Sequence, residues 1–234
     1  EVLSPVDAEG MFDLLTYDKG GSVLRMLEQY LGEEEFKDGI AYYLNKHKYG
    51  NTETNDLWDA IEHVTQQPAR RIMDSWIFQK GYPLVSASIS DDGSTISLTQ
   101  DRFLYTGGDS ADSTIWSVPV VLKVGTSSGV EEVRYLLEEK SAEINLDAPA
   151  DWATANAGGS GFFRARYSSD MLKSLSSTMF ENLSSIERYG LVDDTWSSVM
   201  AGRTSASDFL DFARSFQAEI DLDVWTVLSG CLSS

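Results

Sequence analysis

The chain has 234 residues, of which 42% are hydrophobic and 11% aromatic, enough to bury the core of one large domain or two small ones. Its 37 acidic residues outnumber 18 basic ones, and the formal charge of −19 would repel nucleic acid phosphates and an anionic membrane surface. This balance excludes nucleic acid as the expected partner and indicates a solvated, acidic surface.

Four helices are predicted between Met11 and Lys80, because apolar residues recur there every three or four positions. The apolar face of the first helix is formed by Val23, Met26, Leu27, Tyr30 and Leu31. A second helix is expected from Glu33 to about Lys48, and a third from Thr54, whose hydroxyl would cap it. A fourth should begin near Pro68 and stop by Gly81.

After Pro83 the spacing of apolar residues changes to two, which is typical of strands. Strands at 84–89 and 95–99 should form a hairpin around an Asp-Asp-Gly turn. Further strands are predicted at Trp116–Val124, Val130–Leu137, Ala142–Leu146 and Phe162–Tyr167. Short strands separated by turns favour a small antiparallel β-sandwich.

Beyond Ser168 the pattern is helical again. Helices are predicted at Met171–Leu183, Ser185–Met200, Ala206–Phe216 and Val224–Leu228. Antiparallel helix pairs of this kind usually stack on further pairs, so this segment resembles the start of an α-solenoid. The sequence thus predicts a multi-domain α+β chain with parts at 1–82, 83–167 and 168–234.

The residues offer no self-contained hydrolytic site. His47 and His63 lie on different predicted helices and outside any H-E-x-x-H pattern, so each is interpreted as a surface or structural residue. The glycine-rich segment 158–161 leads into a strand rather than a helix, the wrong context for cradling phosphate. No metal ligand and no cofactor-binding residue is therefore assigned to this chain.

One segment points to a chemistry. Residues 17–27, Tyr-Asp-Lys-Gly-Gly-Ser-Val-Leu-Arg-Met-Leu, follow Met-Phe-Asp at 11–13. Collinear matches follow at 51–52 with 57–58, at 73–76, at 79–85, and at 156–164 with Tyr167. In this order they resemble the zinc aminopeptidases of the M1 (gluzincin) family, of the aminopeptidase N type, whose Y-x-K-G stretch corresponds to residues 17–20.

The resemblance implies the helical end of a thermolysin-like catalytic domain, a complete β-sandwich domain and the start of a helical C-terminal domain. It also implies that zinc is held by two histidines of an H-E-x-x-H motif and a distant glutamate, all upstream of Glu1. Tyr17 would then be catalytic, donating a hydrogen bond to the oxyanion that forms on the scissile carbonyl. The small Gly20 and Gly21 would permit close packing near that site.

The expected function is therefore that of a fragment of an aminopeptidase that removes N-terminal residues from peptides. Zinc would be the cofactor of the full-length enzyme, and peptides would be bound by its upstream part. The isolated chain should be inactive. For Tyr17 the alternative is a buried aromatic residue whose hydroxyl bonds to a neighbouring helix.

Two other functions remain open. The first is a non-catalytic scaffold or pseudoenzyme that binds a protein or peptide. The second, ranked last, is the epoxide-hydrolysing relative in the same superfamily, which lacks a β-sandwich at the place where this chain has one.

The ends and the single cysteine add further expectations. Cys231 allows no intrachain disulfide, and no apolar run approaches the roughly 18 residues that span a bilayer. Residues 1–5 lack an initiator Met and a signal-peptide pattern, so a longer gene product is expected. Side-chain specificity, oligomeric state and compartment stay open, with the cytoplasm slightly favoured because no targeting segment is present.

Overall fold

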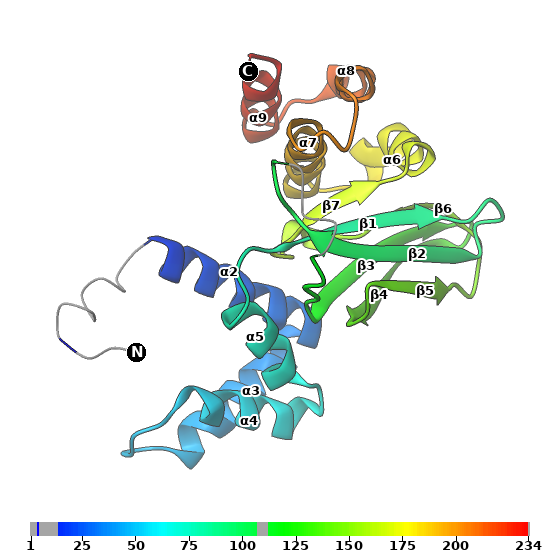
Figure 1. Cartoon of the computed structure of the whole chain (residues 1–234). Helices are drawn as coiled ribbons and strands as arrows, with labels where there is room; N and C mark the ends of the chain where they lie inside the picture. The colour runs from blue at the N-terminus through cyan, green and yellow to red at the C-terminus, as the bar shows by residue number, and fades with distance from the viewer. Residues whose placement is uncertain (1–3, 5–13, 107–111, 234) are drawn as a thin grey trace. The chain divides into compact units, whose positions relative to one another are not determined.

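A computed structural model describes Ser4, residues 14–106 and residues 112–233 of the chain (Figure 1). The chain contains both helices and strands and divides into two compact units. The first unit comprises residues 1–78 with Ser160–Phe162, and the second comprises Gln79–Gly159 with Phe163–Ser234. Met11–Asp13, which precede the tyrosine motif, lie outside the described residues.

The first unit is helical, as predicted. Its helices are α2 (Leu14–Leu31), α3 (Glu33–Lys46), α4 (Thr54–Thr65) and α5 (Ala69–Ile77). The side chains that form its core include Leu27, Trp58, Ile61, Ile72 and Trp76. α3 can pack closely on α4 because Gly39 has no side chain: a Cβ there would lie 3.1 Å from the Ile61 side chain.

Two predicted helix ends in this unit are corrected. Thr54 is the first helical residue of α4 and not its cap; Glu53 precedes the helix, and its backbone N–H donates to the Asp56 carboxylate at 2.8 Å. This reciprocal arrangement of the first turn replaces a threonine cap. α5 ends at Ile77, four residues before the expected stop at Gly81.

The second unit contains two sheets. The strands are β1 (Pro83–Ile89), β2 (Thr95–Arg102), β3 (Val118–Thr126), β4 (Gly129–Leu137), β5 (Ser141–Asn145), β6 (Ala150–Thr154) and β7 (Arg164–Tyr167). One sheet has the order β5-β2-β1-β7 and the other the order β4-β3-β6. β1 and β2 form the predicted hairpin, with Ile89 opposite Ile96.

The expectation of purely antiparallel sheets is wrong at one strand. β7 pairs with β1 in parallel, with Leu84 opposite Arg164 and Ala87 opposite Tyr167. Between β1 and β7 the chain passes through the other sheet and the short 3₁₀ helix η1 (Ala157–Gly159), and this long connection lets β7 return in the same direction as β1. β6 was not predicted.

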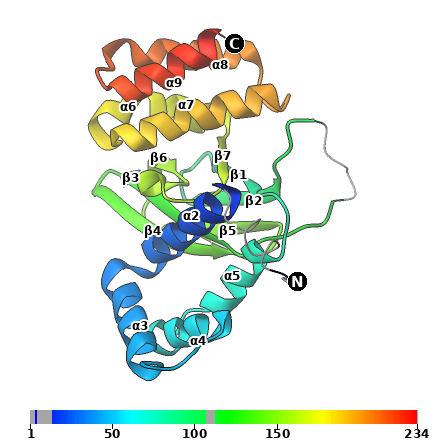
Figure 2. The same cartoon turned by 90° about the vertical axis from the view of Figure 1, so that its left-hand side faces the viewer.

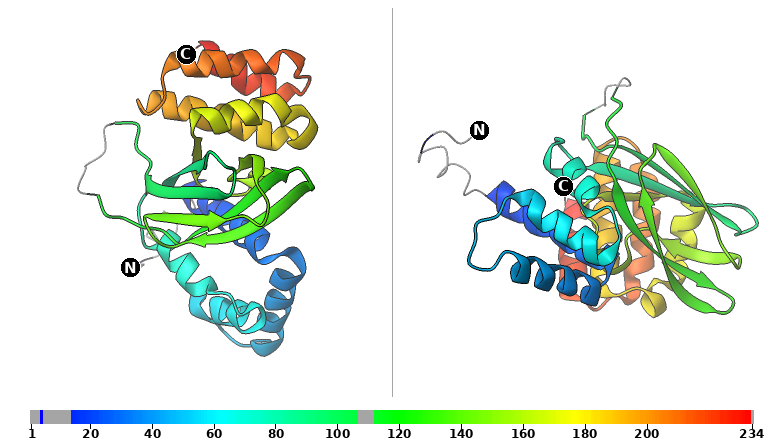
Figure 3. Two further views of the ribbon diagram at one scale, coloured as in Figure 1. Left: turned by 90° about the vertical axis from the view of Figure 1, so that its right-hand side faces the viewer. Right: turned by 90° about the horizontal axis from the view of Figure 1, so that it is seen from below.

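Four helices follow the sheets: α6 (Ser169–Asn182), α7 (Ser185–Met200), α8 (Ala206–Ala213) and α9 (Leu222–Ser233). The predicted helix 206–216 is α8 continued by the 3₁₀ helix η2 (Arg214–Ala218). α6 and α7 lie next to the sheets, and α8 and α9 form an outer layer beyond them (Figure 2; Figure 3, left).

The two compact units do not coincide with the three predicted parts, because the sheets and the helices after Tyr167 fall into one unit. The boundaries at 82/83 and 167/168 coincide with the changes from helix to strand and back, and as domain boundaries they remain predictions. Within the described part of the chain, no helix combines the length and apolar character that crossing a membrane requires.

Candidate functional site

The candidate residue Tyr17 lies in the first turn of α2. Its side chain is 61% exposed, so it is not part of the core of the first unit. Solvent can reach a phenol in this position. The alternative, a tyrosine whose hydroxyl bonds to a neighbouring helix, predicts a buried side chain instead.

The exposure of Tyr17 follows from the periodicity of α2. The inward face of the helix carries Val23, Met26, Leu27 and Leu31, all buried as predicted. Tyr17 lies six positions before Val23, which at about 100° per residue places it roughly 120° around the helix from that residue. The tyrosine is therefore on the flank of the helix, while the apolar stripe fixes the helix to α3 and α5.

The residues next to Tyr17 differ from one another in their surroundings. Burial lowers the pKa of the Lys19 ammonium. Gly20 and Gly21 are not positions of close packing: a Cβ added to either glycine meets no other described atom within 4 Å. The expectation that these glycines allow close packing near the site therefore stays a prediction. Both stand next to open space.

A second segment of the chain reaches α2. The backbone N–H of Phe162 donates to the Met26 sulfur at 3.4 Å, and the Phe162 ring meets the edge of Trp76 with 6.0 Å between ring centroids. The glycine-rich stretch before Phe162 belongs to the motif matches, and Gly158 and Gly159 have positive φ angles of 68° and 65°. Periodicity alone gave no signal for this contact, because it joins residues 136 positions apart.

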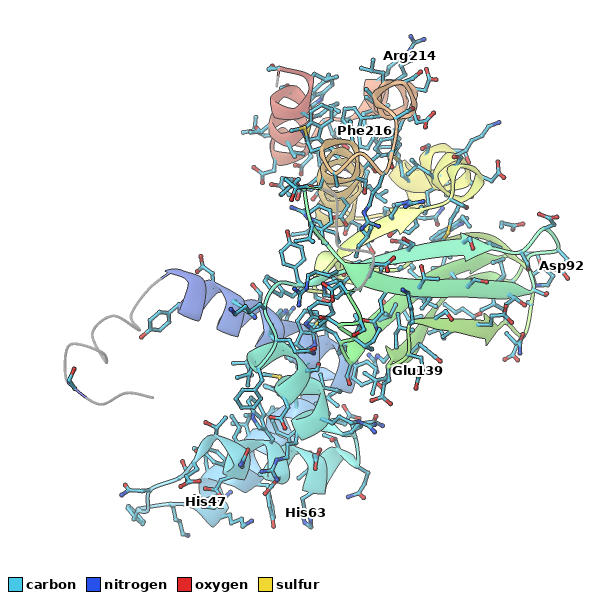
Figure 4. The ribbon with its side chains drawn as sticks, in the orientation of Figure 1. His47, His63, Asp92, Glu139, Arg214 and Phe216 are labelled. Atoms are coloured by element: carbon cyan, nitrogen blue, oxygen red, sulfur yellow. The ribbon has the colours of Figure 1, made fainter. Side chains whose placement is uncertain are left out.

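The two histidines contact different tyrosine side chains of α3. His47 follows α3 and His63 lies on α4 (Figure 4). The His47 ring packs against Tyr43, and the His63 ring stacks on Tyr42 with 4.6 Å between ring centroids. Among the described residues, no group of three or more His, Cys, Asp or Glu side chains could hold a metal ion. These residues therefore do not fit a zinc site.

Among the charged clusters of the second unit, two that join a strand to α7 were missed by sequence reasoning. Arg164 on β7 pairs with Asp193 and Asp194 on α7, and Asp194 also accepts from the backbone N–H of Ala165 at 2.9 Å. Burial raises the pKa of Asp194 to about 6, although Arg164 partly offsets it. Each group bonds to protein partners, so the cluster ties a strand to a helix.

The second cluster joins β3 to α7. Lys123 lies 2.8 Å from the Glu187 carboxylate, which also accepts from the backbone N–H groups of Gly158 and Ser184. Burial alone would raise the pKa of Glu187, but these hydrogen bonds outweigh it and hold the pKa below its usual value of 4.5. No sequence signal marked Lys123 as the partner, 64 positions away.

Comparison with known proteins defines the class of this chain. Residues 1–76 match the model of the Peptidase family M1 domain, and residues 152–234 match that of the ERAP1-like C-terminal domain. The chain is thus related to the M1 peptidase family along its length, and the resemblance carried by the motifs is confirmed.

Several relatives of the chain are named as aminopeptidases. It is 34% identical to the "Puromycin-sensitive aminopeptidase" of Caenorhabditis elegans, over 100% of this chain and 25% of that protein. It is 38% identical to the "Tricorn protease-interacting factor F2" of Thermoplasma acidophilum, over 94% of this chain and 26% of that protein. Identity to "Aminopeptidase M1" of Arabidopsis thaliana is 34%, over 100% of this chain and 27% of that protein. The chain spans about a quarter of the length of these relatives.

Proposed function

We propose that this chain is part of a metallo-aminopeptidase that hydrolyses the N-terminal peptide bond of its substrates, and that Tyr17 stabilises the tetrahedral transition state. The observation that carries the proposal is the exposed phenol of Tyr17 on α2, within the segment that matches the Peptidase family M1 domain. The names of the relatives support the same reaction.

The chemistry assigned to Tyr17 is hydrogen-bond donation. When water adds to the scissile carbonyl, the carbonyl oxygen becomes negatively charged, and the carbon–nitrogen bond breaks as the tetrahedral species collapses. A tyrosine hydroxyl can donate to that oxygen, because a phenol O–H is a hydrogen-bond donor. Because the charge develops only during the reaction, this hydrogen bond lowers the barrier more than it strengthens substrate binding.

The proposed enzyme uses zinc, on which M1 aminopeptidases depend. The described residues of this chain do not fit a zinc site, so the ligands would be supplied by other parts of the longer protein. By itself, the 234-residue chain is proposed to be inactive.

The finer architecture is also part of the proposal. Residues 1–82 would be the helical end of a thermolysin-like catalytic domain, residues 83–167 a β-sandwich domain, and residues 168–234 the start of a solenoid-like helical domain. The alternating burial of β2, and the layering of α8 and α9 outside α6 and α7, support the second and third assignments.

The proposal is tested by Tyr17→Phe in the intact protein. We expect kcat for an N-terminal aminoacyl substrate to fall about 10²–10³-fold, the usual loss for one oxyanion donor, with little change in KM. Tyr49→Phe is the matched control, because Tyr49 is a fully exposed tyrosine in the same unit and has no assigned role.

Unchanged kcat in Tyr17→Phe, or equal losses in both variants, would contradict the role of Tyr17. An intact protein that lacks zinc and aminopeptidase activity would instead favour a non-catalytic scaffold.

A further inference from the structure

The second unit contains a pocket of about 610 Å³ where the end of β7 meets α6, α7 and α8. All its lining residues fall within 165–215, so the pocket belongs to this unit alone. Its volume is in the range of sites that take small organic ligands. The wall is a mixture of polar and apolar surface, with serine and threonine residues from α6, α7, the loop before α8 and η2.

Three basic side chains line this pocket: Arg166, Lys173 and Arg203. None forms an ion pair with a carboxylate in the part of the chain that the structure describes, although acidic residues outnumber basic ones two to one. Arg164 and Arg188 in the same unit show the usual outcome in this chain, since both pair with carboxylates.

The pocket's own carboxylates do not cancel this charge. Asp208 and Asp211 line the wall, and Asp211 lies 3.8 Å from Arg214 on η2. Three positive and two negative side chains leave one positive charge. α6 and α8 also begin at the pocket, where their capping residues Ser168 and Ser205 lie, and each helix start adds about half a positive charge. The sum is about +2, which suits a dianion.

A buried hydroxyl in the wall gives independent evidence for a ligand. Ser198 on α7 is 1% exposed, and its Oγ has no hydrogen-bond partner among the described residues. Buried hydroxyl groups without a partner are rare in folded proteins, because they lose their hydrogen bonds to water. The backbone carbonyl of Ser198 accepts from the N–H groups of Arg203 at 2.8 Å and Thr204 at 3.2 Å, so the same residue also holds the loop that carries Arg203.

We propose that this pocket binds a small phosphorylated polyol: the phosphate dianion lies between Arg166, Arg203 and the starts of α6 and α8, and the Ser198 hydroxyl donates to the ligand. Phosphate is favoured because its charge matches the pocket and helix starts are ready donors to its oxygens. The many wall hydroxyls match the hydroxyls of a polyol. This inference is independent of the function proposed for Tyr17.

Isothermal titration of the intact protein with inorganic phosphate, at constant ionic strength, tests the site. We expect a saturable binding event that Arg203→Gln weakens at least about tenfold. Arg134→Gln, which removes an exposed arginine of β4 outside the pocket, should bind as the wild type does. Glucose 6-phosphate should bind more tightly than phosphate, and glucose alone should not compete.

Ser198→Ala separates a binding role from a structural one. It should weaken phosphate binding about tenfold while leaving the melting temperature unchanged or higher, since it removes an unsatisfied buried group. Circular dichroism of each variant checks that it folds. The site is refuted if Arg203→Gln binds like Arg134→Gln, if chloride competes as well as phosphate, or if Ser198→Ala lowers stability without changing affinity. Equal affinity for phosphate and glucose 6-phosphate would refute the polyol.

Discussion

Gly125 on β3 lies opposite Trp152 on β6, at a point where the register of the two strands shifts. A Cβ added to Gly125 would overlap the Trp152 indole ring, whose residue is 7% exposed. The two strands can pair here only because residue 125 has no side chain. The tryptophan ring on β6 therefore occupies the space that a side chain at position 125 would need.

We predict that Gly125→Ala lowers the free energy of unfolding by about 3 kcal/mol, because a packed core has no room for the added methyl group. Urea denaturation followed by circular dichroism measures this loss. Gly190→Ala is the matched control: Gly190 lies inside α7, and a Cβ there meets no described atom within 4 Å. It should raise stability by about 0.5–1 kcal/mol. Changes of the same sign in both variants would contradict the argument.

At this scale the sequence predicted a candidate residue and its place on a helix, and the catalytic role of Tyr17 stays a prediction. Tyr17 was singled out by a motif, and its place on the flank of α2 follows from helical periodicity. No described atom packs against Gly20 or Gly21, and the sequence does not say which elements lie opposite a glycine, so their close packing stays a prediction. For the same reason the partner of Glu187 could not be found in advance.

At the scale of elements, an ion pair connects β3 to α7. Glu187 is the third residue of the helix and closes the capping box with Ser184, while its carboxylate also bonds Lys123. The Lys123 side chain is 19% exposed and would lose its charged partner if Glu187 were neutral. Removing one member of a buried pair is costly, because the other charge stays buried without compensation.

We predict that Glu187→Gln lowers the free energy of unfolding by about 2–4 kcal/mol at pH 7. The folded pKa of Glu187 lies below its unfolded value, so its contribution is present above about pH 4.5 and is lost as the pH falls through the lowered value. The stability gap between wild type and Glu187→Gln should therefore narrow as the pH falls. Urea titrations between pH 7 and pH 3 measure the gap.

Glu143→Gln on β5 is the control for this experiment, because Glu143 is exposed. It should change stability by less than about 0.5 kcal/mol at every pH. If the stability difference between wild type and Glu187→Gln stays constant or widens toward low pH, the Glu187 carboxylate does not titrate as described.

Element boundaries were predicted well where the pattern was strong. α7 was expected at Ser185–Met200 and is found there. β6 was missed because Ala-Asp-Trp-Ala-Thr is short and contains residues that are infrequent in strands. The parallel pairing of β7 was missed because a period of two reveals a strand but not its direction.

At the scale of the whole molecule, the formal charge of −19 means that acidic side chains repel one another. This repulsion is stronger in the folded state, because folding brings the charges closer together. We predict that the melting temperature rises by about 2–4 °C between 20 mM and 300 mM NaCl, the shift expected when screening relieves about 1 kcal/mol of repulsion. Differential scanning calorimetry measures it. KCl should give the same rise, and a melting temperature that is constant or falls with salt would mean that the acidic residues are already compensated.

The sequence by itself determined the classes of element, the change from helix to strand and back, the acidic surface and the family, because these depend on local spacing, composition and collinear motifs. Only the tertiary structure decided which distant residues meet. It brings together Lys123 and Glu187, Phe162 and Met26, and the strands β7 and β1. It also gathers the basic groups that line the pocket between β7, α6, α7 and α8. The physical reason is that such contacts depend on the path of the chain in space, which the spacing of residues along one element does not encode.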